Sequence, residues 1–312
     1  MEILTEVILK AGRSAIELAL FVLLPVMVVM LAIMRLLEAH GIIDRIIRLL
    51  TPLLRPFGLP GMGVFAALQI SFVSFAAPVA ALSMMEQRGV SDRHLAATLA
   101  MVMAMAQANV TFPMLTMGLN FAVTMTLSFI GGLLAATVTY HLLGRSLSNE
   151  EHAASDESIP NVGEQSRNTL ELINRAGAEA FRIATGAIPM LVLALVAVML
   201  LRELGAIAWL TRLLSPLLVP LSIDPVLILP TLTKVIAGGT AVMGLLDEML
   251  RNNTITVALL NQSAGFFTHP LDVAGVAVLI SAGRRVARVW KIAALGAVVG
   301  ILVRTIGHAM LF

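Results

Sequence analysis

Residues 49–60 read LLTPLLRPFGLP, and residues 213–225 read LLSPLLVPLSIDP. The two phrases share a hydroxyl residue before a proline, two leucines after it, and a second proline four positions further on. Each phrase follows one apolar run and precedes another. A long phrase that recurs with its prolines in order indicates an internal repeat. The sequence therefore predicts a chain built from two related halves.

The composition assigns both halves to the membrane. Of the 312 residues, 58% are hydrophobic and only 13% are charged, whereas about a quarter are charged in a typical soluble domain. Several apolar runs, such as 15–34 and 292–312, reach the roughly 20 residues that a helix needs to cross a bilayer. These observations predict an all-α polytopic membrane protein. Basic residues interleaved with aromatic ones are absent from the sequence, which argues against a nucleic-acid partner.

A polar stretch separates the two halves. Residues 146–168 read SLSNEEHAASDESIPNVGEQSRN, a composition typical of a solvated linker. On either side of it, the residues Glu6–Gly12 align with Glu171–Gly177. We therefore predict a first repeat at 1–145, a polar linker at 146–168 and a second repeat at 169–312.

Each half begins with the same two parts. A spanning helix, at 14–38 or 180–203, comes first. An amphipathic segment follows at 42–55 or 206–219, and its pattern suits a helix that lies in the membrane interface. We expect the prolines of the repeated phrase to end this segment before the chain turns back.

The next two apolar stretches of each half are interrupted. The third stretch is broken at Ser74–Pro78 in the first half and at Ala237–Thr240 in the second. The fourth is broken at Gln107–Pro113 and around Asn261–Pro270. Proline removes an amide hydrogen and paired glycines weaken a helix, so these are predicted helix breaks. A plain spanning helix then closes each half, at 120–144 and 286–311.

The arginines bear on the topology. If the third stretch is a re-entrant hairpin, each half has three transmembrane helices and the two halves are inverted repeats. Most arginines then fall on one side, including Arg45, Arg93, Arg145, Arg175 and Arg284. Basic loops face the cytoplasm, so this model puts the linker in the cytoplasm and both termini on the outer side of the membrane. A third stretch that crosses fully gives four crossings per half and a weaker asymmetry; we prefer the hairpin model.

These features resemble the Gate, or nucleoside-recognition, domain family of bacterial membrane proteins. The resemblance rests on the two copies, the proline-spaced phrases, the helix restart at Ala77-Pro78 and the amides Gln107, Asn109, Asn261 and Gln262. The family is related to domains of spore-maturation membrane proteins and ferrous-iron permeases, and more distantly to concentrative nucleoside transporters. It implies an inverted-repeat fold with broken helices and a midplane site. Phe75–Ala77 departs from the transporters, which have an acidic residue beside this break, so the resemblance does not carry nucleoside binding over directly.

Helix breaks inside a membrane survive only where they are buried in protein or line a cavity, and paired breaks in two halves point to a transport site. Kinks satisfied by Ser and Thr hydroxyls are the alternative. Amides suit a neutral or zwitterionic ligand, but they also join helices by hydrogen bonds. The predicted substrate-binding residues are Ser71, Ser74, Gln107, Asn109, Thr111, Thr233, Lys234, Gly238, Gly239, Thr240, Asn261, Gln262 and Ser263.

Three ionisable residues lie close to the predicted helix breaks of the second half. A charge at mid-membrane costs roughly 2.5–3.5 kcal/mol, so we expect Lys234 to have a counter-charge or a functional role. It could meet an anionic substrate group, pair with Asp247, Glu248 or Asp272, or reach the interface. His269 and Asp272 could relay a proton, although a histidine beside a turn often hydrogen-bonds a helix end. The histidines form no metal-binding pair, so we expect no metal and no cofactor.

The sequence thus favours a secondary transporter or permease-like protein over an enzyme. It contains no Walker A loop, nucleophile elbow or dinucleotide fingerprint. We expect it to move a small polar metabolite, anionic or nucleoside-like, through a midplane site between the halves. We expect membrane lipid to surround the protein, and the sequence does not decide between a monomer and a homodimer. The alternative is a non-transporting scaffold that assembles with partner membrane proteins through glycines such as Gly118, Gly131, Gly132, Gly296 and Gly300.

Overall fold

The computed structural model describes residues 2–150, 168–218 and 223–312, and every regular element in these ranges is helical. Within them, five helices are long and apolar enough to cross a membrane: Thr5–Ala39, Asp92–Leu115, Phe121–Leu143, Thr169–Leu201 and Arg284–Leu311. A bent pair, Ile42–Phe57 with Gly61–Phe72, raises the number to six if it is one span. The prediction of an all-helical polytopic membrane protein is confirmed. Residues 151–167 of the predicted linker lie outside the described ranges.

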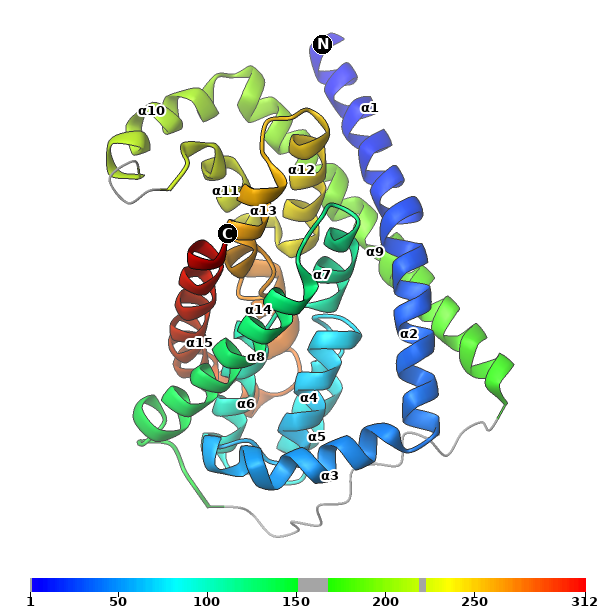
Figure 1. Cartoon of the computed structure of the whole chain (residues 1–312), viewed down its shortest axis with the longest axis vertical. Helices are drawn as coiled ribbons and strands as arrows, with labels where there is room; N and C mark the ends of the chain where they lie inside the picture. Colours follow the sequence, from blue (N-terminus) through cyan, green and yellow to red (C-terminus); the bar gives the residue numbers. More distant parts are fainter. Residues whose placement is uncertain (1, 151–167, 219–222) are drawn as a thin grey trace.

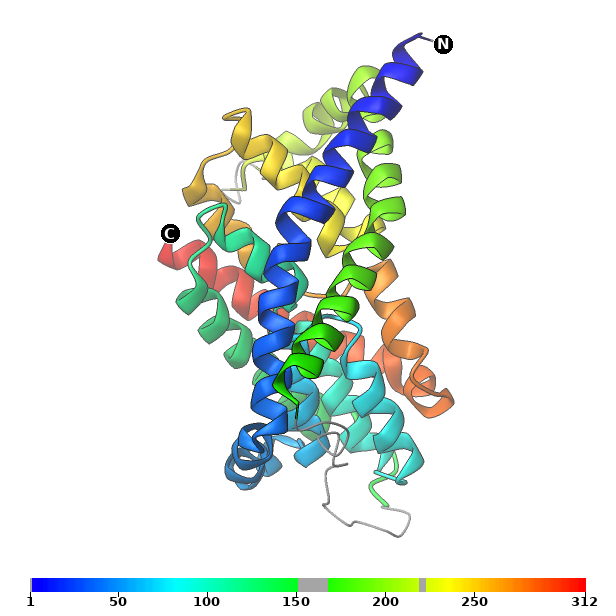
Figure 2. The ribbon, with the colours of Figure 1, turned by 90° about the vertical axis from the view of Figure 1, so that its right-hand side faces the viewer.

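Two long helices pass each other in opposite directions along one side of the molecule (Figures 1 and 2). The first comprises α1 (Glu2–Glu17), a π-helical turn η1 (Leu18–Leu23) and α2 (Leu24–Ala39). The second is α9 (Thr169–Glu203). The widened turn ends two residues before Pro25, which lies in the first turn of α2 and has no amide hydrogen to donate to the preceding turn.

Small residues let the two long helices approach closely. Ala11, Ala15 and Ala19 of the first helix are fully buried and belong to the same core cluster as Leu191 and Leu195 of α9. At the other end of the pair the sizes are exchanged. Ala176, Ala180 and Ala184 of α9 share a cluster with Leu23, Met27 and Leu31. Small side chains thus pack with large ones towards both ends of the helix pair, which favours van der Waals packing between membrane helices.

The amphipathic segments form α3 (Ile42–Leu54), which a short 3₁₀ helix η2 (Arg55–Phe57) extends, and α10 (Ala206–Leu218). They lie at opposite ends of the molecule (Figure 1). The expectation that the prolines end these helices is wrong for the first proline of each phrase. Pro52 and Pro216 lie inside α3 and α10, at the cost of one backbone hydrogen bond each. The end of the first segment comes at Gly58, whose φ of +81° only glycine adopts freely.

The third stretch of each half is broken where we predicted. In the first half, α4 (Gly61–Phe72) is followed by α5 (Pro78–Gln87). In the second, the 3₁₀ turn η5 (Pro225–Leu227) and α11 (Ile228–Ala237) are followed by α12 (Gly239–Arg251). The members of each pair pack against each other, and the two pairs lie at opposite ends of the molecule (Figures 1 and 2). Gly238 has a φ of +86°, so a residue with a side chain would be strained at this break.

The fourth stretch is also broken within the predicted ranges, at Gln107 in the first half and at His269-Pro270 in the second, although neither break extends over the whole predicted range. In the first half, α6 (Asp92–Ala104) gives way to α7 (Ala108–Leu115), which contains Pro113. In the second, α13 (Val257–Phe267) gives way to α14 (Val273–Ile280). Asn261, Gln262 and Ser263 therefore lie inside α13 and not at a break. The break falls instead at 268–272, because Pro270 disfavours helix at the preceding residue and the Asp272 side chain accepts a hydrogen bond from Gly275 that starts α14.

The plain helices that close each half pack together. They are α8 (Phe121–Val138), which a π-helical turn η3 (Thr139–Leu143) extends, and α15 (Arg284–Leu311); both also contact α6. Gly300 of α15 meets the backbone of Gly131, and Gly296 meets Thr139. The glycines that could have served a partner protein at this seam are thus used inside the chain.

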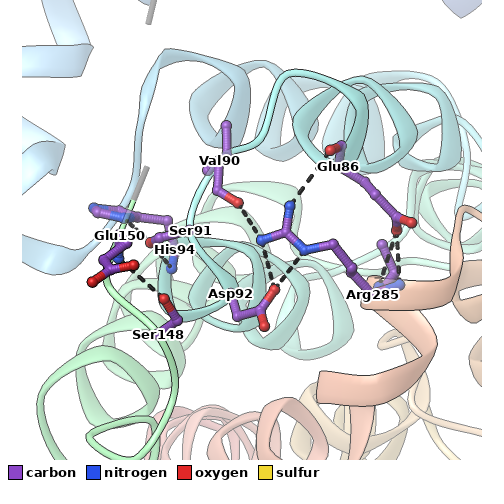
Figure 3. Close-up of polar contacts among 9 residues, drawn as sticks. Glu86, Val90, Ser91, Asp92, His94, Ser148, Glu150 and Arg285 are labelled. Atoms are coloured by element: carbon purple, nitrogen blue, oxygen red, sulfur yellow. Dashed lines mark hydrogen bonds and ion pairs between the residues drawn. The ribbon is translucent and has the colours of Figure 1, made fainter. Parts of the chain in front are cut away.

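A polar cluster ties the C-terminal end of α5 to the beginning of α15 (Figure 3). One carboxylate oxygen of Glu86 accepts hydrogen bonds from the backbone amides of Arg285, at 3.0 Å, and Val286, at 3.2 Å. The Arg285 guanidinium donates to Asp92 at 2.7 Å and to the Val90 carbonyl at 2.7 Å. The cluster joins residues that are about 200 positions apart and caps the first turn of α15 with negative charge, which helix dipoles favour.

Replacing Arg285 with glutamine is expected to lower the free energy of unfolding by about 2 kcal/mol, since the side chain loses charge-assisted hydrogen bonds to Asp92 and Val90. The matched control is Arg284→Gln, because Arg284 is exposed and next in sequence. We expect that control to stay within about 0.5 kcal/mol of wild type. Thermal unfolding of the two purified variants checks this, and equal stabilities would contradict the role given to Arg285.

Candidate functional site

All four helix breaks meet at one cavity. Its volume is about 400 Å³, which is within the range of roughly 300–1,000 Å³ for small-molecule sites. One wall comes from the two long helices, and the rest comes from the ends of the broken ones. The lining residues at the breaks are Ser74, Phe75, Ala76, Gln107, Asn109, Ala237, Gly238, Gly239, Thr240, Ala241, Asp272, Ala274 and Gly275; those of the long helices are Leu23, Arg182, Ile183, Gly186, Ala187 and Leu191.

Asn109, in the first turn of α7, links three of the breaks. Its side-chain oxygen accepts a hydrogen bond from the Phe75 amide at 3.2 Å. Its side-chain nitrogen donates to the Thr240 hydroxyl at 3.2 Å. The break of the first hairpin is thereby satisfied by a side chain from α7, and the break of the second hairpin is held in the same place. Such satisfaction is what irregular backbone needs at membrane depth.

Gln107 links the remaining break. Its backbone amide donates to the Thr268 carbonyl at 2.9 Å, and its side-chain nitrogen donates to the His269 carbonyl at 3.1 Å. Gly239 lies directly beside the Gln107 amide group, so that a Cβ at Gly239 would overlap it. This close approach explains the second glycine of the Gly238-Gly239 pair, as the positive φ explains the first.

An ion pair lies beside the cavity. The Lys234 ammonium donates to one carboxylate oxygen of Asp272, and both side chains are almost completely buried. The other carboxylate oxygen accepts from the Gly275 amide at 2.8 Å. Of the partners weighed for Lys234, the chain thus uses Asp272. The pair joins α11 to the beginning of α14 and places a compensated carboxylate in the cavity wall.

The structure brings together only part of the predicted site. Ser74, Gln107, Asn109, Gly238, Gly239 and Thr240 line the cavity, and so does Asp272 from the suggested proton relay. The residues that do not line it are Ser71, Thr111, Thr233, Lys234, Asn261, Gln262, Ser263 and His269. Lys234 nevertheless acts on the wall through Asp272.

Several of the residues outside the cavity have structural partners. Asn261 accepts a hydrogen bond from the Asn120 amide at 2.7 Å and donates to the Gly118 carbonyl at 3.0 Å, so it holds the turn between α7 and α8. The Thr233 and Ser263 hydroxyls donate to carbonyls of their own helices. The His269 ring accepts from the Leu271 amide at 3.0 Å, and in the described residues no hydrogen bond joins it to Asp272.

The sequence reasoning missed the wall formed by the long helices. Arg182, Gly186 and Ile183 lie on one stripe of α9 and face the breaks. Arg182 is not among the residues predicted for the site. The helical spacing of Arg182 and Gly186, one turn apart, was the available signal, but nothing local distinguishes this stripe from a lipid-facing one.

Replacing Asn109 with alanine is expected to lower the free energy of unfolding by about 1–2 kcal/mol, because the partly buried Phe75 amide loses its hydrogen-bond acceptor. The matched control is Asn174→Ala, since Asn174 is an exposed asparagine on α9. Denaturation of both variants in detergent micelles measures the difference. A loss no larger than in the control would mean that the Asn109 bridge contributes nothing to stability.

Comparison with known proteins identifies a family match for residues 20–125 and solved structures with a similar fold. Residues 20–125 match the family model Gate, described as nucleoside recognition. The match runs from η1 to the start of α8, and the predicted resemblance to this family is confirmed there. No curated protein sequence matches the chain.

Solved structures of the concentrative nucleoside transporter CNTnw have a similar fold. The inward-facing substrate-bound state has a TM-score of 0.67 at 17% identity, covering 99% of this chain and 83% of that chain. A variant in an outward-facing state has a TM-score of 0.69 at 18% identity, covering 93% and 75%. An intermediate state has a TM-score of 0.68 at 18% identity, covering 93% and 76%. The chain therefore has a fold like that of this transporter.

Proposed function

We propose that this chain is a secondary transporter-like membrane protein that moves a small polar solute through the cavity between its broken helices. The observation that carries the proposal is the convergence of all four breaks on one cavity. Half-helix ends at such a place offer backbone amides and carbonyls that no lipid could satisfy, and they form the solute sites of many secondary transporters. The fold similarity to CNTnw supports the same reading.

The solute in this proposal is nucleoside-like, and it is either neutral or anionic. The cavity wall has amide and hydroxyl groups at Gln107, Asn109, Thr240 and Ser74, which both donate and accept hydrogen bonds. Arg182 adds a cation, whereas the carboxylate of Asp272 is compensated by Lys234. The description of the Gate model as nucleoside recognition favours a nucleoside among polar solutes.

The architecture we propose is a pair of inverted repeats, 1–145 and 169–312, with the linker 146–168 between them. Three observations support it: the long helices run in opposite directions, α3 and α10 lie at opposite ends, and the two hairpins do so as well. Each repeat would contribute three transmembrane helices, an interfacial helix and a re-entrant hairpin. In the orientation we propose, within a bacterial inner membrane, the linker is cytoplasmic and both termini are periplasmic. The basic loops support this orientation.

Binding to the purified full chain tests the function. Uridine, adenosine and their monophosphates are added to the protein in lipid nanodiscs, and affinity and thermal unfolding are measured. We expect at least one compound to bind and to raise Tm, since a ligand of the native state alone stabilises it. The monophosphates separate an anionic solute from a neutral one. Uptake of the binding compound into proteoliposomes then tests transport itself.

A variant pair connects binding to the cavity. Thr240→Val removes a hydroxyl from the wall, whereas Thr185→Val removes one that donates to its own helix at 2.7 Å. We expect about tenfold weaker binding for the first, which corresponds to one lost hydrogen bond of about 1.4 kcal/mol, and no change for the second. Absence of any binding by the wild-type chain, or equal effects of the two variants, would overturn the proposal.

A further inference from the structure

Two cations lie completely inside the bundle. Lys234 on α11 and Arg304 on α15 both have no exposed surface, and they are the largest side chains buried to this extent in the described residues. A buried charge is costly unless other groups compensate it. The groups that compensate these two side chains belong to the ends of broken helices, and this location suggests what the charges do.

Lys234 forms an ion pair with Asp272, the one carboxylate in the described lining of the cavity. Asp272 has both oxygens engaged, one by the Lys234 ammonium and one by the Gly275 amide at 2.8 Å. In the described part of the cavity wall, no second carboxylate is present. The same residue ranges contain no group of three or more Asp, Glu, His or Cys side chains able to hold a metal ion. A free cation would therefore have to displace the ammonium to reach this carboxylate.

Arg304 occupies the second place where a cation would be attracted. Its guanidinium donates to the Ala104 carbonyl, at the end of α6, and to the Thr268 hydroxyl at 2.6 Å, at the end of α13. Helix C-termini carry partial negative charge. In transporters with broken helices, such half-helix ends and the unwound carbonyls beside them coordinate the coupling sodium ion.

We infer that Lys234 and Arg304 are built-in cations that take the place of a coupling sodium ion, so that the solute site forms without bound Na⁺. The inference rests on the proposed function, because it concerns the coupling of that same site. Each cation bridges elements from two different breaks: Lys234 joins α11 to α14, and Arg304 joins the end of α6 to the end of α13. They thus stabilise the arrangement that an external ion would otherwise have to stabilise on each transport cycle.

The first experiment uses the wild-type chain in nanodiscs and needs no solute. Equilibrium binding of ²²Na⁺ and Tm are measured in NaCl and in choline chloride at equal ionic strength. We expect no saturable ²²Na⁺ binding and the same Tm in both salts. Saturable binding that unlabelled Na⁺ competes away, or a Tm that rises only in NaCl, would overturn the inference.

The second experiment removes one built-in cation. In Lys234→Gln the Asp272 carboxylate loses its ammonium, and we expect Na⁺ to raise Tm by several degrees relative to choline. The double variant Lys234→Gln/Asp272→Asn is expected to lose this response. Lys291→Gln, an exposed lysine at the beginning of α15, is the matched control and should respond as wild type does. A folded Lys234→Gln protein that is indifferent to Na⁺ would contradict the inference; if this variant does not fold, the wild-type measurement still decides.

The outcomes separate this inference from the proposed function. If no nucleoside or nucleotide binds, transport is refuted while the sodium measurements stand. If solute binding is found and depends on Na⁺ in the wild-type chain, transport stands and the built-in cations are refuted.

Discussion

Replacing Asp272 with alanine is expected to remove about 3–5 kcal/mol from the free energy of unfolding, because it leaves the Lys234 ammonium buried without a counter-charge. The ion pair is almost completely enclosed, so water cannot replace the lost carboxylate. The variant also loses the hydrogen bond that the Gly275 amide donates to Asp272 at the beginning of α14. Chemical denaturation in detergent micelles measures the change.

A matched variant separates the buried charge from the helix cap. Asp224 accepts a hydrogen bond from the Val226 amide at 2.9 Å, but it is exposed and has no ion-pair partner among the described residues. Asp224→Ala should therefore cost only about 1 kcal/mol, as the loss of an N-cap usually does. Combining Asp272→Ala with Lys234→Met is expected to recover most of the loss, since neither charge is then buried alone. Equal losses for Asp272→Ala and Asp224→Ala, or a double variant no better than the single one, would show that the ion pair does not matter for stability.

The second large effect is expected at the seam between α8 and α15. A Cβ on Gly300 would overlap the carbonyl of Gly131, and this obstacle is backbone and not a flexible side chain. Gly300→Ala therefore requires the two helices to move apart, and we expect a loss of about 3 kcal/mol, at the upper end of overpacking costs.

Gly12 on α1 provides the control for that variant. A Cβ on Gly12 meets no atom within 4 Å, so Gly12→Ala changes only the preference of the backbone. It should leave stability unchanged or raise it by up to about 1 kcal/mol, the difference in helix propensity between glycine and alanine. Thermal unfolding of the two alanine variants in the same detergent compares them. Similar Tm values would mean that the close approach of α8 and α15 is not a constraint on packing.

The seam also bears on the rival explanation, a scaffold for partner membrane proteins. Some glycines that seemed available for contacts with another chain lie so close to residues of this one that a Cβ would overlap them: Gly131 with Arg304, Gly132 with Met105, and Gly118 with Val257. They explain how this bundle packs, so they no longer support a partner. The cavity, by contrast, has no role in a scaffold, and this contrast favours transport.

The sequence by itself determined the class of the protein and the places where two of its helices are interrupted. Few charges and long apolar runs predict a membrane protein. Pro78 and Gly238 interrupt their helices for reasons that lie within a few residues, namely a missing amide hydrogen and a positive φ. The repeated proline phrase indicated two similar halves, because a repeat can be recognised from the order of the residues without knowledge of the fold.

Only the tertiary structure decided which side chains meet. From the sequence, three carboxylates were possible partners of Lys234. In the structure its partner is Asp272, 38 residues away. Asn261 looked like a residue of a helix break, yet it lies inside α13 and holds the turn at Gly118. Arg182 lies in the cavity wall because the two long helices run antiparallel to each other and α9 also packs against the broken helices. The physical reason is the same in each case: backbone breaks follow from local sterics, whereas polar partners follow from the packing of distant helices, and a single sequence does not encode that packing locally.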